Sequence, residues 1–159
     1  MWKVSVIFIA ALSLVACSKS GDAGGGGGGG AAKSLTLAKF NNLKVDAPEG
    51  SKAGDAPIGK GVMIRGPNLV VTIEEASDTR PKDLKAAKED ADMYSPKNMK
   101  EEKLADGWAM TFENKGGMGT NYFVQVRREI GGKSYWCETT CSKPEQMANA
   151  LAACKSLKP

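Results

Sequence analysis

Apolar residues from Ser34 onward follow a period of two in some segments and a period of three to four in others. The first alternating stretch ends at the turn Ala47-Pro-Glu-Gly50, and its apolar positions are Leu35, Leu37, Leu43 and Val45. Segments 61–65 and 68–74 flank Gly66-Pro67, and the second of them is rich in β-branched residues. The pattern predicts half-buried strands, the last two joined as a hairpin.

A helical period comes next. Its apolar and small positions are Leu84, Ala87, Ala91 and Tyr94, and the opposite face is charged. Ser77 or Thr79 is suited to cap this helix, Pro81 to lie in its first turn, and Ser95-Pro96 to end it. We therefore expect a surface helix whose charged face is solvated.

The period of two returns in the second half of the chain. Two apolar series carry it, Trp108, Met110 and Phe112 in one segment and Tyr122, Val124, Val126 and Ile130 in the next. Gly131-Gly132 has the composition of a two-residue hairpin turn. It leads into a segment dense in aromatic and β-branched residues that reaches about Thr140. We expect three more strands here.

A last helix is expected to begin at Ser142, because Glu145 three positions later completes a capping box and Pro144 suits the first turn. Its apolar stripe consists of Met147, Ala150, Leu151 and Cys154. The order strands, helix, strands, helix predicts an α+β domain: a mostly antiparallel sheet with two packed helices.

Three short segments carry a resemblance to a known family. They are Val45-Asp-Ala-Pro-Glu-Gly50, Asp106-Gly-Trp108 and Ala153-Cys-Lys-Ser-Leu157. With them, the folded region resembles the PsbP-like α/β sandwich domains, which recur in small exported bacterial lipoproteins. The resemblance implies an αβ sandwich and assigns no functional residue, because that fold hosts unrelated tasks.

The first sixteen residues have the pattern of an export signal. Lys3 precedes an apolar run of about twelve residues, which is too short to span a bilayer stably. The run ends in Leu14-Val-Ala-Cys17, which resembles the lipobox of bacterial lipoproteins. The resemblance implies that lipid is attached to Cys17 and that palmitate is among its acyl chains. The alternative is an ordinary secretory signal. Ser18 rather than aspartate follows the cysteine, and by resemblance to Gram-negative sorting this favours the outer membrane over the inner one.

Residues 17–33 are expected to form a lipidated tether. They include seven consecutive glycines, Gly24 to Gly30, with no Gly-Lys-Ser/Thr after them, so a phosphate-binding loop is excluded. Such a tether has a root-mean-square reach of roughly 20–25 Å. The chain thus divides into a signal (1–16), a tether (17–33) and one folded domain (34–159).

Composition excludes several classes of function. Histidine is absent, which removes Ser-His-Asp and Cys-His catalysis and every imidazole metal ligand. The formal charge of +4 is spread along the chain rather than clustered with aromatic residues, so nucleic acid is not an expected partner.

Three cysteines remain in the expected domain: Cys137, Cys141 and Cys154. In an oxidising compartment two of them are expected to pair. Cys141 and Cys154 lie at opposite ends of the expected last helix, roughly 17 Å apart, which disfavours a disulfide between them. Cys137–Cys154 is favoured, because the helix runs back along the strand. Cys137–Cys141 remains possible with a sharp turn, and a thiolate metal site is a weaker alternative.

The strongest candidate binding patch lies on the last hairpin. Trp136, beside Arg127 and Arg128, would form an aromatic and cationic surface if its side chain were exposed. Burial under the first helix and a solvated strand edge are the alternatives. The carboxylate pairs Glu74-Glu75 and Glu101-Glu102 are adjacent on strands and therefore diverge, which argues against paired acid–base catalysis.

The sequence therefore predicts a membrane-anchored envelope lipoprotein that is not an enzyme and has no cofactor and no metal. Its expected partners are the membrane, through the lipid on Cys17, and an envelope protein that the domain binds or scaffolds. The alternative is a ligand- or polysaccharide-binding module that uses Trp136, Arg127 and Arg128. A hydrolase based on carboxylates is a third, weaker hypothesis.

Overall fold

The structure, a computed structural model, describes residues 32–117 and 119–159. The expected signal, Cys17 and the glycine run lie outside the described residues. The first strand begins at Ala32, two residues before the expected start of the domain. The elements are β1 (Ala32–Leu37), η1 (Ala38–Phe40), β2 (Leu43–Pro48), β3 (Lys52–Asp55), β4 (Val62–Gly66), β5 (Leu69–Glu75), α1 (Leu84–Ala91), η2 (Asp92–Tyr94), β6 (Lys97–Leu104), β7 (Gly107–Gly116), β8 (Gly119–Ile130), β9 (Lys133–Cys141) and α2 (Pro144–Lys155).

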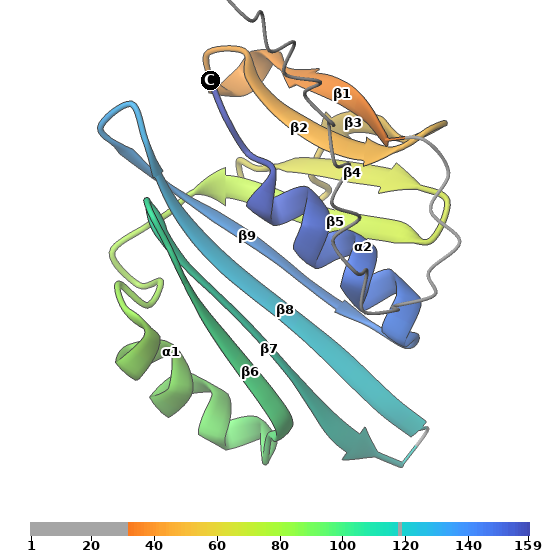
Figure 1. The fold of residues 1–159 in the computed structure, drawn as a ribbon, viewed down its shortest axis with the longest axis vertical. Helices are drawn as coiled ribbons and strands as arrows, with labels where there is room; N and C mark the ends of the chain where they lie inside the picture. Colours follow the sequence, from red (N-terminus) through yellow and green to blue (C-terminus); the bar gives the residue numbers. More distant parts are fainter. Residues whose placement is uncertain (1–31, 118) are drawn as a thin grey trace, which may run out of the picture.

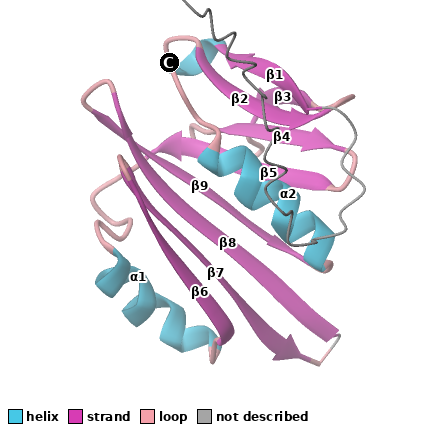
Figure 2. Ribbon diagram, viewed as in Figure 1, coloured by secondary structure: helices cyan, strands magenta, loops and turns pink. Residues whose placement is uncertain are grey.

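Seven strands form one antiparallel sheet in the order β3-β4-β5-β9-β8-β7-β6. β9 lies near the centre, where Cys137 is opposite Ile73 of β5 on one side and Val126 of β8 on the other. β1 and β2 pair with each other as a separate two-stranded sheet. The expected α+β class, with a mostly antiparallel sheet and two packed helices, is confirmed (Figure 2).

The two α-helices pack on opposite faces of the large sheet. α2 lies across β5, β9 and β8 (Figure 1). Its Ala150 and Ala153 share a core with Val126 and Ile73. α1 packs on the other face, over a cluster of large side chains from β7 and β9: Trp108, Met110, Phe112 and Trp136. Successive residues of β7 are therefore buried on both faces of the sheet.

The small sheet extends the core on the α2 side. Leu37, Leu43 and Val45 are buried in the same cluster as the residues beneath α2. The chain end is fastened there, because Lys44 and Lys158 exchange two backbone hydrogen bonds.

A disulfide joins α2 to the central strand. Cys137 and Cys154 are bonded at an S–S distance of 2.01 Å, with their Cα atoms 5.6 Å apart, and both residues are fully buried. The favoured pairing is confirmed, and Cys141 is a half-buried free thiol. The geometric reason holds: the strand continues past Thr140 and the helix returns along it.

Both helices begin later than the sequence pattern suggested. Asp83 caps α1, with its carboxylate accepting a hydrogen bond from the backbone N–H of Ala86 at 2.9 Å. The hydroxyls of Ser77 and Thr79 form a hydrogen bond with each other instead. Both residues, and Pro81, lie in the loop that precedes the helix.

The expected capping box of the last helix is also wrong. Lys143 is the N-cap residue without a side-chain cap, and Pro144 is the first helical residue. Glu145 accepts a hydrogen bond from the side chain of Asn68 at 2.9 Å rather than turning back to the cap.

Candidate functional site

The three residues of the expected hairpin patch do not meet on an exposed surface. Trp136 is only 1% exposed and lies in the cluster beneath α1, with its ring centroid 5.6 Å from that of Trp108. The guanidinium of Arg80 lies over the ring of Trp136, 5.2 Å from its centroid. Burial under the first helix, one of the alternatives, is therefore the observed position.

Arg127 and Arg128 point to opposite faces of β8 because they are adjacent on one strand. Arg127 is buried and donates hydrogen bonds to Glu129 at 3.0 Å, Ser134 at 2.8 Å and the carbonyl of Pro81 at 3.3 Å. These bonds hold the loop before α1 against the last hairpin.

Arg128 fastens the other face of the sheet. It forms two bonds of 2.8 Å to the carboxylate of Asp106 and also donates to the carbonyl of Lys155. The hydrogen bonds from Arg128 lower the pKa of Asp106 below its ordinary value, although partial burial opposes this shift. Both arginines thus have structural partners.

The carboxylate pairs diverge as expected. Glu74 pairs with Arg80 and its neighbour Glu75 with Lys133, on opposite faces of β5. Glu101 and Glu102 pair with Lys88 of α1 and Lys155 of α2 respectively, so the two sides of β6 carry one carboxylate each. Neither pair converges on a common point.

Cys141 also lacks the environment of a reactive thiolate. Burial raises the pKa of its thiol above the ordinary value, although a contact with the backbone of Lys143 acts in the opposite direction. Its Sγ lies 3.6 Å from the carbonyl oxygens of both Tyr122 and Lys143, so its single S–H can donate to either one.

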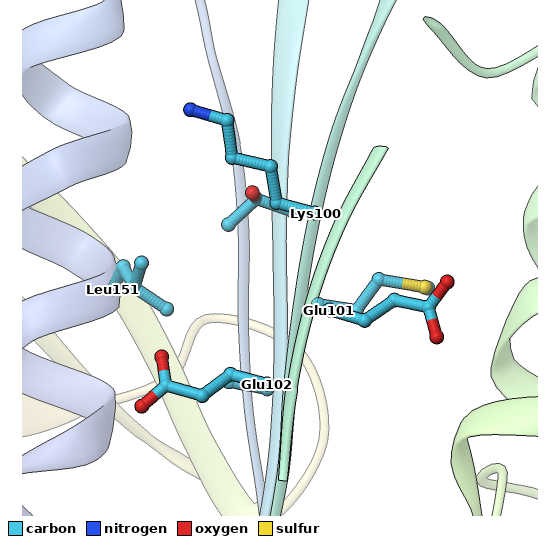
Figure 3. Close-up of a pocket in the computed structure, with 7 residues that line it drawn as sticks. Lys100, Glu101, Glu102 and Leu151 are labelled. Carbon is cyan, nitrogen blue, oxygen red and sulfur yellow. The ribbon is translucent and has the colours of Figure 1, made fainter. Parts of the chain in front are cut away.

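A small hollow lies between α2 and β6. Its volume is about 280 Å³, and Lys100, Glu102 and Leu151 lie at its sides. Figure 3 shows Leu151 of α2 pointing across the hollow toward β6, while Glu101 points to the opposite face of the sheet. The 2.7 Å ion pair between Glu102 and Lys155 joins β6 to α2 beside it. The hollow is small and the carboxylate of Glu102 in its wall is engaged by Lys155, so it is the weaker candidate.

A larger hollow lies on the α1 face, over the strands that α1 leaves uncovered. Its volume is about 370 Å³. Its floor comes from β5, β9 and β8, and Tyr94 of η2 forms one wall. We call it the open-face groove, with Val70, Thr72, Gln125, Glu138 and Thr140 as its floor and Tyr94 and Phe123 as its wall.

The alternation of the strands explains why these side chains share one face. Trp136, Glu138 and Thr140 are alternate residues of β9, and the first of them lies under α1 while the next two line the groove. Thr72 is opposite Glu138, which is opposite Gln125, so one row of polar side chains crosses three strands.

An aromatic stack builds the wall of the open-face groove. Phe112 and Phe123 are stacked at 4.5 Å, and the ring of Tyr94 lies 5.1 Å from that of Phe123. Asn114 donates a hydrogen bond to the carbonyl of Tyr94 at 3.3 Å, and Ser95 reverses the chain with a left-handed backbone. Tyr94 is thereby held at the rim, 42% exposed.

An ion-pair cluster closes the opposite end of the groove. Arg80 donates to Glu74 at 2.9 Å and to both oxygens of Glu138, at 2.7 and 3.3 Å. Burial by itself would lower the pKa of Arg80, but its hydrogen bonds and charge interactions with Glu74 and Glu138 outweigh burial and raise it. Glu138, the one charged side chain of the lining, is therefore paired with Arg80, which it shares with Glu74.

Sequence reasoning missed Tyr94, Gln125, Glu138 and Thr140 as site residues. Tyr94 was assigned to the buried stripe of the first helix, whereas it follows the end of α1 in η2. The alternation of apolar and polar residues in β8 and β9 does indicate that Gln125 and Glu138 lie on the face of the sheet opposite the disulfide. Which part of that face α1 covers depends on packing between distant segments.

No protein-family model matches the chain, and no curated protein sequence matches it. Among residues 32–117 and 119–159, no helix is long and apolar enough to cross a membrane. The same residues contain no group of three acidic or cysteine side chains that could hold a metal ion.

Proposed function

We propose that this protein is a lipid-anchored lipoprotein of the bacterial envelope whose folded domain is a non-catalytic ligand-binding module. The anchor rests on the lipobox pattern at Cys17, and the outer membrane is the favoured location. The domain would be held close to the membrane by the glycine-rich tether that ends where β1 begins.

One observation supports ligand binding over scaffolding: the open-face groove. A scaffold presents a broad contact surface, whereas a ligand site is concave, with apolar walls and a few convergent polar groups. The groove has this composition, because aromatic and aliphatic side chains surround the polar row Thr72, Gln125 and Glu138. Val70, which lies on its floor, is 45% exposed although it is a large apolar residue.

The experiment uses the full chain in its own membrane, with a photo-reactive amino acid at Val70. The matched control is the same substitution at Ile58, an apolar residue that is 87% exposed and lies outside the groove. We expect discrete adducts from Val70 and none from Ile58.

Equal labelling from both positions would contradict the groove as the binding site. Adducts from Val70 that contain only another envelope protein would favour the protein-binding interpretation of the domain. Labelling with radioactive palmitate, lost in Cys17→Ser, tests the anchor separately.

A further inference from the structure

We infer that the ligand of the open-face groove is a neutral saccharide. This inference rests on the proposed function, in which the groove is the binding site. The inference depends on three properties of the lining: its charge, its unpaired polar groups and its aromatic wall.

The charge of the lining favours a neutral ligand. Glu138 is its one charged side chain and is bonded by Arg80, whose Nε, Nη1 and Nη2 atoms all donate to carboxylates. Arg65 of β4 is a second cation at the edge of the groove, where its Nε donates to Sδ of the lining residue Met63. With it, the formal charges of the two arginines and two glutamates around the groove sum to zero, so the groove favours an ion of neither sign. A cationic ligand would have to be desolvated beside a carboxylate that already has its partner, which is costly.

The polar groups favour a ligand that brings hydrogen-bond donors. The Oε1 atom of Gln125 is buried and has no hydrogen-bond partner within the described residues. An unpaired buried acceptor costs free energy that a ligand's O–H or N–H group can recover. The terminal torsion of a glutamine amide is soft, so the amide can turn toward such a donor. The hydroxyl of Thr140 lies on the neighbouring strand β9, and that of Thr72 lies on β5, one strand further.

The wall favours a ligand with apolar faces. Tyr94 and Phe123, with Val70 on the floor, present aromatic and aliphatic surface beside the polar row. A sugar ring combines C–H groups on its faces with hydroxyl donors around its rim, and this matches both parts of the lining. The volume of about 370 Å³ is at the lower end of the range of roughly 300–1,000 Å³ for ligand pockets.

An extended peptide fits this groove less well. Peptides that bind sheets add to an unpaired strand edge, where main-chain hydrogen bonds supply the affinity. The strands of the floor, β5, β9 and β8, each pair with a neighbour on both sides, so their main chains are already bonded. The groove thus offers side chains alone to its ligand.

Two trisaccharides with the same skeleton test the charge requirement. Triacetylchitotriose is neutral, whereas the glucosamine trimer is cationic, and maltotriose serves as a neutral sugar without acetamido groups. Isothermal titration calorimetry is performed on the full-length protein in detergent micelles. We expect at least one neutral sugar to bind at least tenfold more tightly than the glucosamine trimer.

Variants of the groove test the location. Tyr94→Ala should weaken binding by about three- to tenfold, as for the loss of one aromatic contact, whereas Tyr94→Phe should retain it. Thr72→Val changes a floor hydroxyl without changing the shape and should also weaken binding. Ile58→Ala is the control and should bind like the wild type. Thermal unfolding of each variant verifies that it is folded.

Binding of neither neutral sugar, tighter binding of the cationic trimer, or equal binding by wild type, Tyr94→Ala and Thr72→Val would overturn the inference. Failure with the sugars together with specific adducts at Val70 would leave the proposed function standing and reject the saccharide. Loss of the Val70 adducts as well would reject both.

Discussion

Replacing Cys154 by serine should remove a large part of the stability of the domain. The disulfide joins residues 17 positions apart, and the chain-entropy model gives about 3 kcal/mol for a loop of this length. That is a substantial share of the roughly 5–15 kcal/mol by which a typical domain is stable. For a domain of this size, it corresponds to a decrease in the melting temperature of roughly 10 °C.

The assay is urea unfolding followed by circular dichroism at constant pH, in the Cys17→Ser background so that no lipid is present. Cys137→Ser should match Cys154→Ser, because either change removes the same bond. Cys141→Ser is the matched control and should change the free energy of unfolding by about 0.5 kcal/mol or less, as for sites outside the core. A loss below about 1 kcal/mol for Cys154→Ser, or a loss as large for Cys141→Ser, would refute the reasoning.

Three further predictions concern the anchor, the tether and one strand start. Cys17→Ser should move the protein from the membrane to the aqueous fraction; a variant that sediments with membranes like the wild type would contradict the lipobox. Deleting Gly24–Gly30 should leave the melting temperature unchanged, and a decrease of several degrees in calorimetry would show that this segment contributes packing. Gly107→Ala should destabilise the domain by about 2 kcal/mol or more in urea unfolding, because its Cβ would lie 2.0 Å from the carbonyl oxygen of Arg127. Gly54→Ala, whose Cβ meets nothing within 4 Å, should cost much less, and equal losses would reject this explanation.

β7, β8 and β9 could be predicted because apolar and polar residues alternate along them over many positions, whereas β6, which is mostly exposed, was missed. The disulfide followed from the same pattern, since the lengths of one strand and one helix place Cys154 beside Cys137. β3 could not be predicted, because its four residues are all exposed and show no apolar alternation. Pairing with β4 at the edge of the sheet, rather than burial, orders it.

The open-face groove escaped prediction for a related reason. The pattern from Ser77 to Tyr94 suggested one long helix, but Asp83 starts α1 late and η2 ends it, which leaves eight residues or about 12 Å. A helix of this length covers Trp108 and Trp136 but not the polar row from Thr72 to Gln125. The lengths of covering elements are set by caps and tertiary contacts, which the apolar period does not encode.

The pairing of β5 with β9 has a consequence for the order in which the chain can fold. Thr72 of β5 can pair only after Glu138 of β9 is present, and the residues between them supply three other strands of the sheet. Long-range pairing of this kind must overcome the entropy of closing a large loop and is intrinsically slow. The halves of the sheet are joined only once the C-terminal strand is available, and α2 with its cysteine comes later still. A chain translocated from its N-terminus would therefore remain without its completed sheet until nearly all of it had crossed, a property that suits secretion in an unfolded state.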